Sequence, residues 1–366
     1  MSILFEPYPI GRLTLKNRFI KSSTAESMAG PDGEVTPPML DFYETIAKGG
    51  CACIFLGHAF VHPLGKAHSK MTGVHDDRFI PGLRSLAEVI HRHRCYVFAQ
   101  LNHGGSRLEK GIAEPVGPSP VVHPITGLCG RELRSSEIWE IIHAFGQAAR
   151  RVRKAGLDGI LIHGAHGYLV SLFNSPFANK RMDEWGRTLE DQFRFLREVY
   201  RSIRNAVGAD YPVAVKLGVR DDMEEGLSIE EGANLASWLV KEGIDAIEIS
   251  GGVPTKEAGA SRSHIHSQEQ EAYFLSYAKV VRPNVGRLPL SLVGGLRSPQ
   301  LMEKIIGEGW TDFVSLARPF ICEPDLVEKI RKGRREPVAC TRDDLCRTGF
   351  GQEGLRCRRH ETPDSA

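Results

Sequence analysis

Short apolar runs alternate with longer amphipathic stretches along most of the chain. The runs are rich in Val, Ile and Phe, as in strands buried on both faces, and the stretches between them have helical periodicity. We expect eight strands, at residues 19–22, 53–56, 96–100, 159–162, 213–217, 246–249, 290–292 and 312–315. Helices are expected between them, at residues 37–48, 82–94, 136–155, 188–207, 228–242, 267–281 and 298–308.

Capping residues support several of these helices. Ser136, Ser228 and Ser298 each precede a periodic stretch, where a serine side chain can accept a hydrogen bond from a first-turn amide. Pro299 stands at a position whose amide would be unpaired in any case. Eight strands with intervening helices predict an α/β fold, a single eight-stranded parallel β/α (TIM) barrel. An open doubly wound sheet is the alternative, but no Gly-x-Gly-x-x-Gly turn follows any strand.

The barrel is expected to occupy residues 1–333 as one domain. Residues 102–135 form the longest stretch without periodicity and follow the third strand directly, so we expect them to cover the active-site face as a lid or substrate wall. After Gly333 the chain becomes polar and loses its periodicity. This change predicts that residues 334–366 form a tail packed on the barrel or trailing from it.

Charge and composition exclude several classes of partner. Lys and Arg number 47 against 45 Asp and Glu, a formal charge of +2, which does not favour a nucleic-acid partner. No leader-like N-terminus and no window of about 18 apolar residues is present, so no membrane partner is expected. The eight cysteines are dispersed, which is typical of reduced thiols. We therefore expect a cytoplasmic protein; whether it forms a homo-oligomer is left open.

Polar residues and glycines follow each expected strand, at the end where β/α barrels carry their active sites. Gly294 and Gly295, with Ala317 and Arg318 after the last strand, are typical of a phosphate site built from backbone amides and a helix N-terminus. The glycines could also serve only a tight turn. The other candidates are Ser23, Thr24, Ala25, Gly57, His58, Gln100, His163, His166, Tyr168 and Lys216.

Several of these residues lie in segments that resemble the old yellow enzyme family of flavin oxidoreductases. The resemblance covers about residues 3–332. It implies a β/α barrel with non-covalent FMN, reduced by NADH or NADPH. The segments are NRFIKSSTAES (17–27), FAQLNHGG (98–105), IHGAHGYLVSLFNSPFANKRMDEWG (162–186), VGGLRS (293–298) and DFVSLARPF (312–320).

The resemblance also implies which residues hold the flavin. Gln100 would bind the pyrimidine edge of the ring, since an amide offers both a donor and an acceptor. Lys216 would lie near N1 and the C2 carbonyl, where a cation stabilises the charge of the reduced ring; alternatively it extends from a strand end to solvent. The remaining expected contacts are Ser23, Thr24, Ala25, Gly57 and His58. Relatives often carry Thr or Cys in place of Ala25, and His58 could narrow the pocket or be an ordinary loop residue.

The same resemblance gives the catalytic residues. His163 and His166 would bind a substrate carbonyl or phenolate oxygen, and Tyr168 would donate a proton to the α-carbon. Two alternatives stay open for the histidines: a zinc site, although the local sequence offers no third ligand, or a structural role. We expect no metal.

The implied function is that of an NAD(P)H-dependent FMN oxidoreductase of the ene-reductase type. Hydride would pass from NAD(P)H through flavin N5 to an α,β-unsaturated carbonyl compound, a small molecule with an electron-poor C=C bond. We expect NAD(P)H and the substrate to use one pocket in turn, because residues 334–366 leave no room for a second nucleotide-binding domain. An amine dehydrogenase-like flavoenzyme and a flavin-binding protein without a dedicated substrate are alternatives.

One departure from larger relatives concerns their iron–sulfur cluster. Cys340, Cys346 and Cys357 stand where cluster ligands are expected, but Asp343 replaces the second ligand of the run. Cys322 could in principle substitute for it. We expect that no cluster binds and that the segment is a vestige of a cluster-bearing ancestor.

Overall fold

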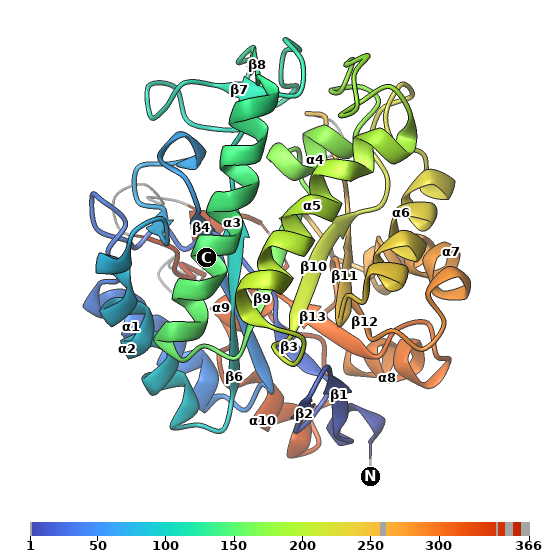
Figure 1. Ribbon diagram of the computed structural model, residues 1–366. Helices are drawn as coiled ribbons and strands as arrows, with labels where there is room; N and C mark the ends of the chain where they lie inside the picture. Colours follow the sequence, from blue (N-terminus) through green and yellow to red (C-terminus); the bar gives the residue numbers. More distant parts are fainter. Residues whose placement is uncertain (1, 257–260, 342, 348–353, 360–366) are drawn as a thin grey trace, which may run out of the picture.

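The computed structural model describes residues 2–256, 261–341, 343–347 and 354–359. Parallel strands form a ring in which β3 pairs with both β4 and β13. The ring is therefore closed, which confirms the expected barrel and excludes an open sheet (Figure 1). Its strands are β3 (Phe19–Lys21), β4 (Cys53–Phe60), β6 (Tyr96–Asn102), β9 (Gly159–Gly164), β10 (Val213–Gly218), β11 (Ala246–Ser250), β12 (Leu290–Val293) and β13 (Phe313–Leu316).

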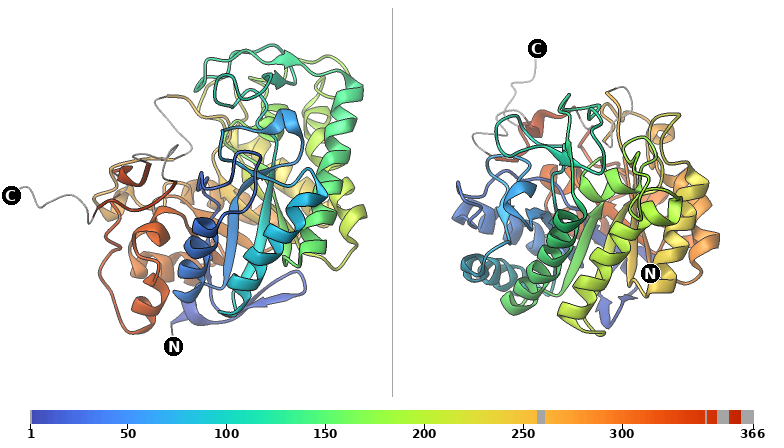
Figure 2. Two further views of the ribbon diagram at one scale, coloured as in Figure 1. Left: turned by 90° about the vertical axis from the view of Figure 1, so that its left-hand side faces the viewer. Right: turned by 45° about the horizontal axis from the view of Figure 1, so that its top comes forward.

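Amphipathic helices cover the outside of the ring, one between each pair of consecutive barrel strands (Figures 1 and 2). Their apolar faces pack on the strands, as the helical periodicity predicts. These helices are α1 (Pro37–Lys48), α2 (Ile80–His91), α3 (Ser135–Ala155), α5 (Leu189–Val207), α6 (Ile229–Glu242), α7 (Leu275–Val285) and α8 (Pro299–Gly307). Short helices follow β9 and β13: α4 (Leu169–Asn174), α9 (Arg318–Cys322) and α10 (Leu326–Arg331).

Two expected helix starts are confirmed and two are wrong. The Ser228 side chain accepts a hydrogen bond from the Glu231 amide, and Ser298 directly precedes α8. Ser136 instead lies inside α3, which begins one residue earlier. The helix expected at 267–281 begins only at Leu275, because the chain turns at Ala272 (φ 51°). The amide of the next residue, Tyr273, donates to the carbonyl of Gly294, which follows β12.

An antiparallel hairpin not predicted from the sequence closes one end of the barrel. It consists of β1 (Tyr8–Ile10) and β2 (Leu13–Leu15) and lies below the ring in Figure 1. Its apolar residues pack with inward-facing residues near the starts of the barrel strands, including Phe55, Phe98 and Leu161. The lower interior is therefore filled by apolar side chains, and open space remains at the carboxyl ends of the strands.

Shorter elements complete the fold. The loop between β6 and α3 contains β7 (Val116–Gly117) and β8 (Arg131–Glu132), and β5 (Thr72–Gly73) extends the sheet beside β4. Single turns of 3₁₀-helix occur at η1 (Ile3–Phe5), η2 (Pro63–Gly65), η3 (Asp77–Phe79), η4 (Gln268–Gln270) and η5 (Leu345–Arg347).

The described residues after 333 lie against the barrel. The Val338 amide donates to the Arg297 carbonyl (3.0 Å), and the Leu355 amide donates to the Glu26 carbonyl (2.8 Å). Val338 and Leu355 are buried. This segment therefore packs against the barrel near the carboxyl ends of the strands. The domain division at residue 333 stays a prediction.

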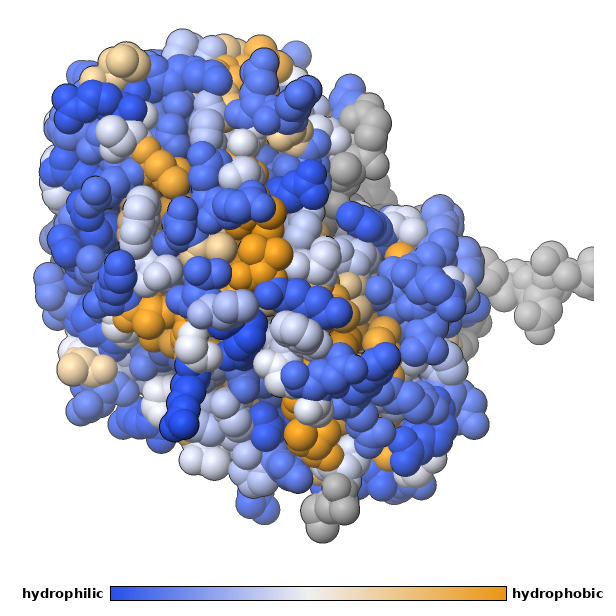
Figure 3. All heavy atoms as spheres, turned by 90° about the vertical axis from the view of Figure 1, so that its right-hand side faces the viewer, coloured by the Kyte–Doolittle hydropathy of each residue, from blue (hydrophilic) through white to orange (hydrophobic). Residues whose placement is uncertain are grey.

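Along the described part of the chain, no helix is both long and apolar enough to cross a bilayer. On the side of the barrel that carries α6 and α7, apolar residues form small patches separated by polar ones (Figure 3). This face is therefore largely solvated, as expected for the outer faces of amphipathic helices.

Candidate functional site

A cavity of about 410 Å³ lies at the carboxyl ends of the barrel strands. This volume is typical of cofactor and small-molecule sites. Most of the residues predicted from the sequence line it together: Ser23, Thr24, Ala25, His58, Gln100, His163, His166, Tyr168, Lys216, Ala317 and Arg318.

Strand register brings the polar side chains to one level of the barrel. On β9, β10 and β11, His163 pairs with Lys216, and Lys216 pairs with Glu248. On β4 and β6, His58 pairs with Gln100. Because neighbouring parallel strands hold residues of one layer side by side, these groups meet above the apolar lower interior.

A register shift in β4 determines where His58 points. Phe55 faces the barrel interior with Phe98, and in a regular strand a residue three positions later would face outward. The irregularity between Phe55 and His58 adds the residue needed to turn His58 inward beside Gln100. It also turns Gly57 away from the cavity, where its amide donates to the Tyr43 hydroxyl (2.7 Å). Gly57 is not among the lining residues of the cavity.

The two glycines after β12 lie beneath an aromatic ring. Gly294 and Gly295 have φ of 127° and 81°, and a Cβ on either would approach Tyr273 ring atoms to about 3 Å. Tyr273 lines the cavity, whereas neither glycine is among its lining residues. Their predicted phosphate contacts therefore stay a prediction.

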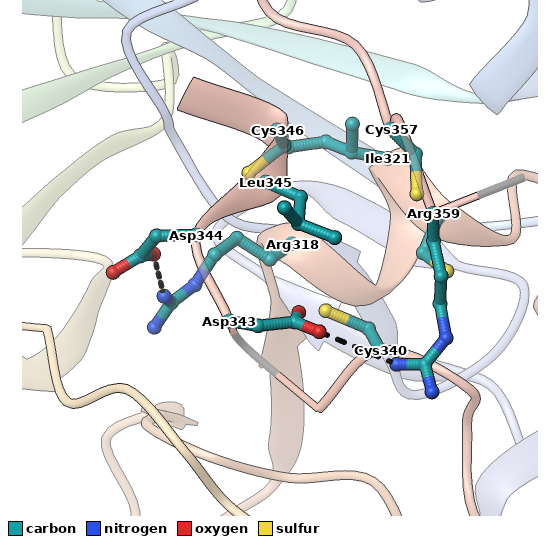
Figure 4. A pocket seen from close by; sticks show the side chains of 10 residues that line it. Arg318, Ile321, Cys340, Asp343, Asp344, Leu345, Cys346, Cys357 and Arg359 are labelled. Atoms are coloured by element: carbon teal, nitrogen blue, oxygen red, sulfur yellow. Dashed lines mark hydrogen bonds and ion pairs between the residues drawn. The ribbon is translucent and has the colours of Figure 1, made fainter. Parts of the chain in front are cut away.

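Arg318 lies at the start of α9 and is already engaged. It forms an ion pair with Asp344 and donates to the Arg262 carbonyl (2.6 Å). Asp344 belongs to the segment that follows α10. Sequence periodicity did not predict its contact with Arg318 (Figure 4). A phosphate at Arg318 would share the guanidinium with that carboxylate.

Gln100 keeps an unused donor in the cavity wall. The Ser23 hydroxyl donates to Gln100 Oε1 (2.6 Å), which leaves the amide nitrogen buried and without a hydrogen-bond partner among the described residues. A buried donor without a partner is costly unless a ligand satisfies it. The Gln100 amide therefore fits a cofactor that presents a carbonyl or ring-nitrogen acceptor.

Two buried lysines lie near the carboxyl ends of β3 and β10. Lys216 Nζ contacts the Glu248 carboxylate (2.9 Å) and donates to the Ser22 hydroxyl (3.1 Å). Lys21 Nζ donates to the Ser22 carbonyl (2.7 Å), and burial lowers its pKa to about 8. Lys216 therefore has a fixed position at the cavity wall, where it can stabilise negative charge on a bound ring.

His163, near the end of β9, forms one cluster with His166 and Tyr168, which follow that strand. The His163 ring centroid lies 4.8 Å from that of Tyr168 and 5.1 Å from that of His166. His166 Nε2 is hydrogen-bonded to Ser250 Oγ (2.7 Å), while His163 Nδ1 has no partner in the part of the chain that is described. Burial lowers the pKa of both histidines well below its ordinary value, so both are neutral at neutral pH. A neutral imidazole can still donate one N–H to a substrate oxygen.

His58 narrows the cavity beside this cluster. Its Nδ1 accepts from Asn102 Nδ2 (2.8 Å), and its Nε2 lies 3.2 Å from His68 Nε2. Its ring centroid is 5.1 Å from that of Tyr168. Since both ring nitrogens are engaged, His58 presents a carbon edge to the cavity rather than a hydrogen-bonding group.

Arg107 was not predicted from the sequence. It comes from the non-periodic loop after β6, lines the cavity, and places its guanidinium 4.9 Å from the Tyr168 ring centroid. It also donates to the His166 carbonyl. A cation over the ring face stabilises the negative charge left when a phenol gives up its proton.

The predicted loop wall contributes to the cavity only in part, and a second stretch contributes beside it. The loop at 102–135 supplies Arg107 and Ile125, and the stretch from Pro254 to His266 supplies Pro254, Thr255, Lys256 and Ser261. Residues 257–260 of that stretch lie outside the described residues.

No group of three or more His, Cys, Asp or Glu side chains is arranged to hold a metal ion within the described ranges. His163 and His166 are therefore not joined by a third ligand there. Both side chains line the cavity, and the expected absence of a metal stays a prediction.

Several histidines with a lowered pKa predict a loss of stability in mild acid. Burial lowers the pKa of His68 and His123 to about 4 and that of His103 to about 3, against 6.5 in the unfolded chain. Below pH 6.5 the unfolded state binds protons that the folded state does not, so unfolding becomes easier as the pH falls. Each such histidine contributes up to about 1.4 kcal/mol per pH unit in this window. The melting temperature should therefore fall steadily from pH 7 to pH 5; an unchanged value would contradict these assignments.

Comparisons with known proteins give a consistent result. A family model described as NADH:flavin oxidoreductase / NADH oxidase matches residues 3–337. The chain is 35% identical over 362 residues to an NADH oxidase of Thermoanaerobacter brockii, covering 97% of this chain and 55% of the relative. It is 31% identical over 325 residues to an NADPH dehydrogenase of Clostridium acetobutylicum, covering 88% and 93% respectively. The chain thus spans about half the length of the first relative and nearly all of the second.

A solved structure agrees with the sequence relatives. The complex of 2-naphthoyl-CoA reductase with 2-naphthoyl-CoA superposes with a TM-score of 0.88 at 29% identity. The superposition covers 93% of this chain and 54% of that chain. The match therefore includes nearly all of the barrel.

Proposed function

Because the chain belongs to the NADH:flavin oxidoreductase / NADH oxidase family, we propose that it reduces the activated C=C bond of an α,β-unsaturated carbonyl compound with NADH or NADPH. The family binds FMN and takes electrons from NAD(P)H, and the old yellow enzyme resemblance predicted from the sequence is confirmed. The observation that carries the proposal is the cluster of His163, His166 and Tyr168 in the same cavity as Gln100 and Lys216.

The residues present fit FMN. Bound in this cavity, FMN supplies hydride transfer from the nicotinamide to the substrate carbon. The unpartnered Gln100 amide is suited to the pyrimidine edge of the ring, and Ser23 fixes the orientation of that amide. Lys216 supplies a cation whose position is fixed by Glu248.

His163 and His166 would bind and polarise the substrate carbonyl. Each neutral imidazole can donate one N–H to the oxygen, and the bond between His166 and Ser250 restricts the orientation of that ring. Donors aimed at an oxygen that gains negative charge stabilise the transition state more than the ground state. The β-carbon of the conjugated system becomes a better hydride acceptor as a result.

Tyr168 would provide the proton for the α-carbon. Its hydroxyl belongs to a side chain that lines the cavity, packed between His58 and His163 and covered by Arg107. This packing limits motion of the ring, and a general acid needs such a fixed position for efficient proton transfer.

Conjugated thioesters belong in the substrate panel beside enones, because the solved relative is a reductase in complex with a conjugated acyl thioester.

The cofactor assignment predicts that the purified protein is yellow and releases FMN rather than FAD on denaturation. Gln100→Leu should weaken FMN binding about tenfold, because the variant loses one buried hydrogen bond. Gln147→Leu is the matched control, since the Gln147 side chain is hydrogen-bonded to His143 on the outside of α3. A colourless protein that cannot be reconstituted with FMN would refute the assignment.

Arg107 provides a prediction about proton transfer. Arg107→Gln should slow enone reduction by about twofold to thirtyfold, the range expected for loss of a cation–π contact. Reduction by NAD(P)H should change less, because that step needs no proton from Tyr168. The control is Arg134→Gln, which removes a solvent-exposed cation beside Glu137. Rapid-mixing measurements on both half-reactions decide the matter, and equal loss in both would assign Arg107 a purely structural role.

A further inference from the structure

A left-handed turn at residues 165–168 connects β9 to α4 and carries two of the proposed catalytic side chains. His166 and Gly167 have φ of 65° and 72°, and Tyr168 follows them directly. Residues other than glycine rarely adopt this backbone region, because their Cβ then crowds a neighbouring carbonyl. The conformation of His166 therefore depends on contacts from the rest of the protein.

Two side chains of the loop after β6 donate to consecutive carbonyls of this turn. Arg107 donates to the His166 carbonyl, and His123 Nε2 donates to the Gly167 carbonyl (3.2 Å). The approach at Gly167 is close, since a Cβ on this glycine would lie 2.6 Å from His123 Nε2. The loop is therefore bonded to the turn at two successive residues.

The second ring nitrogen of His123 organises the loop itself. The Ile125 and Thr126 amides donate to His123 Nδ1 (3.2 and 3.4 Å), so the ring proton lies on Nε2, which faces Gly167. His123 is buried, and burial lowers its pKa to about 4, so the ring is neutral at neutral pH. Its single N–H is therefore committed to the turn.

The same part of the loop forms a wall of the cavity. Val122 and Cys129 are paired by an antiparallel bridge, so residues 122–129 form a small hairpin. Ile125, at the tip of this hairpin, lines the cavity. His123 thus connects one wall of the cavity to the turn that carries the proposed catalytic residues.

We propose that His123 is a positioning residue, which holds the 165–168 turn so that His166 and Tyr168 face the substrate. His123 is not among the lining residues of the cavity, so it acts through the turn. Nδ1 orders the hairpin, and Nε2 fixes the carbonyl that lies between the two catalytic side chains. The inference rests on the proposed function, because positioning matters only if His166 and Tyr168 act on the substrate.

Two substitutions separate the roles of the two ring nitrogens. In His123→Asn, the side-chain oxygen can still accept from the amides two and three residues later, as in an Asx turn, but the side chain is too short to reach Gly167. In His123→Gln, the amide nitrogen takes about the place of Nε2 and can still donate to the Gly167 carbonyl. The local acceptor is then lost.

The loss of the bond to the turn should slow the step that uses Tyr168. His123→Asn should lower kcat for enone reduction by about fivefold to fiftyfold, the effect of losing one buried hydrogen bond that positions a reacting group. Reduction by NADH or NADPH should change less, because it needs no proton from Tyr168. His123→Gln should restore most of the rate of enone reduction.

Thr126→Val is the matched control for a loosened hairpin. It removes the hydrogen bond from the Thr126 hydroxyl to the Ser106 carbonyl (2.9 Å), while the bond from His123 to Gly167 stays in place. The ratio of the two half-reaction rates should therefore stay at the wild-type value in Thr126→Val.

Hydrogen exchange reports on the turn without any substrate. The Gly167 amide donates to the Ser171 hydroxyl (3.2 Å), so it is protected while the turn is intact. In the holoprotein, peptides that cover residues 165–168 should exchange faster in His123→Asn than in the wild type. In His123→Gln they should exchange at close to the wild-type rate.

Three results would overturn the proposal. The first is wild-type exchange together with a wild-type kcat in His123→Asn. The second is equal loss of both half-reactions in His123→Asn, which would assign the residue to general stability. The third is an impairment of His123→Gln as large as that of His123→Asn. If the wild-type protein reduces no conjugated carbonyl compound, the proposed function fails, and the exchange rates still decide whether His123 holds the turn.

Discussion

Replacing Tyr168 with phenylalanine should slow enone reduction by about 100-fold to 10,000-fold, the usual effect of removing a positioned general acid. Reduction by NADH or NADPH should stay near the wild-type rate, because it needs only hydride transfer. The two half-reactions can be separated by anaerobic rapid mixing. The packing of Tyr168 against His163 and beneath Arg107 is apolar or ring-to-cation contact, so the loss of one hydroxyl should preserve it.

Tyr273→Phe is the matched control for this prediction. Tyr273 also lines the cavity, but its ring lies over Gly294 and Gly295. Quinones can take protons from solvent, so their reduction by Tyr168→Phe should suffer much less than that of enones. Equal impairment of both half-reactions would show that Tyr168 is structural and that another group donates the proton.

His163→Ala and His166→Ala should each lower kcat/KM for an enone by about 100-fold to 1,000-fold, the range found on removing one donor to a developing oxyanion. Both KM and the hydride-transfer rate should be affected, since the same N–H holds and polarises the carbonyl. Because burial lowers the pKa of both rings, kcat/KM should not track protonation of either histidine between pH 6 and pH 8.

His143→Ala serves as the control, because His143 is exposed on α3 and its ring is hydrogen-bonded to Gln147. The His166 prediction has an internal check in Ser250→Ala. The Ser250 hydroxyl is hydrogen-bonded to the His166 ring. Loss of this hydroxyl should raise KM because His166 is then positioned less firmly. A wild-type KM in His163→Ala and His166→Ala would contradict the proposed carbonyl site.

The positions of the strands and most of the cavity could be predicted from the sequence. Strands buried on both faces appear as continuous apolar runs, and barrel geometry places the residues after each run at one end of the ring. Gln100, Lys216, His163, His166 and Tyr168 line one cavity, as this geometry predicts.

The features that escaped prediction depend on irregular backbone or long-range contact. Gly57 comes after the second apolar run, but the register shift in β4 turns it out of the cavity and turns His58 inward. Arg107 lies in a loop whose path has no periodic signal. The helix expected to begin at residue 267 begins only at Leu275, after a turn at Ala272, a case in which packing overrides local preference.

The central claim is tested most directly by one anaerobic measurement. The yellow protein is bleached with one equivalent of NADPH and mixed with an enone, an enoyl thioester or the matching saturated carbonyl compound, while flavin absorbance and product are monitored. The account predicts that only the conjugated compounds restore the absorbance, each giving one equivalent of product saturated at the C=C bond. Recovery of the absorbance with oxygen or quinones but with none of the conjugated carbonyl compounds would contradict it.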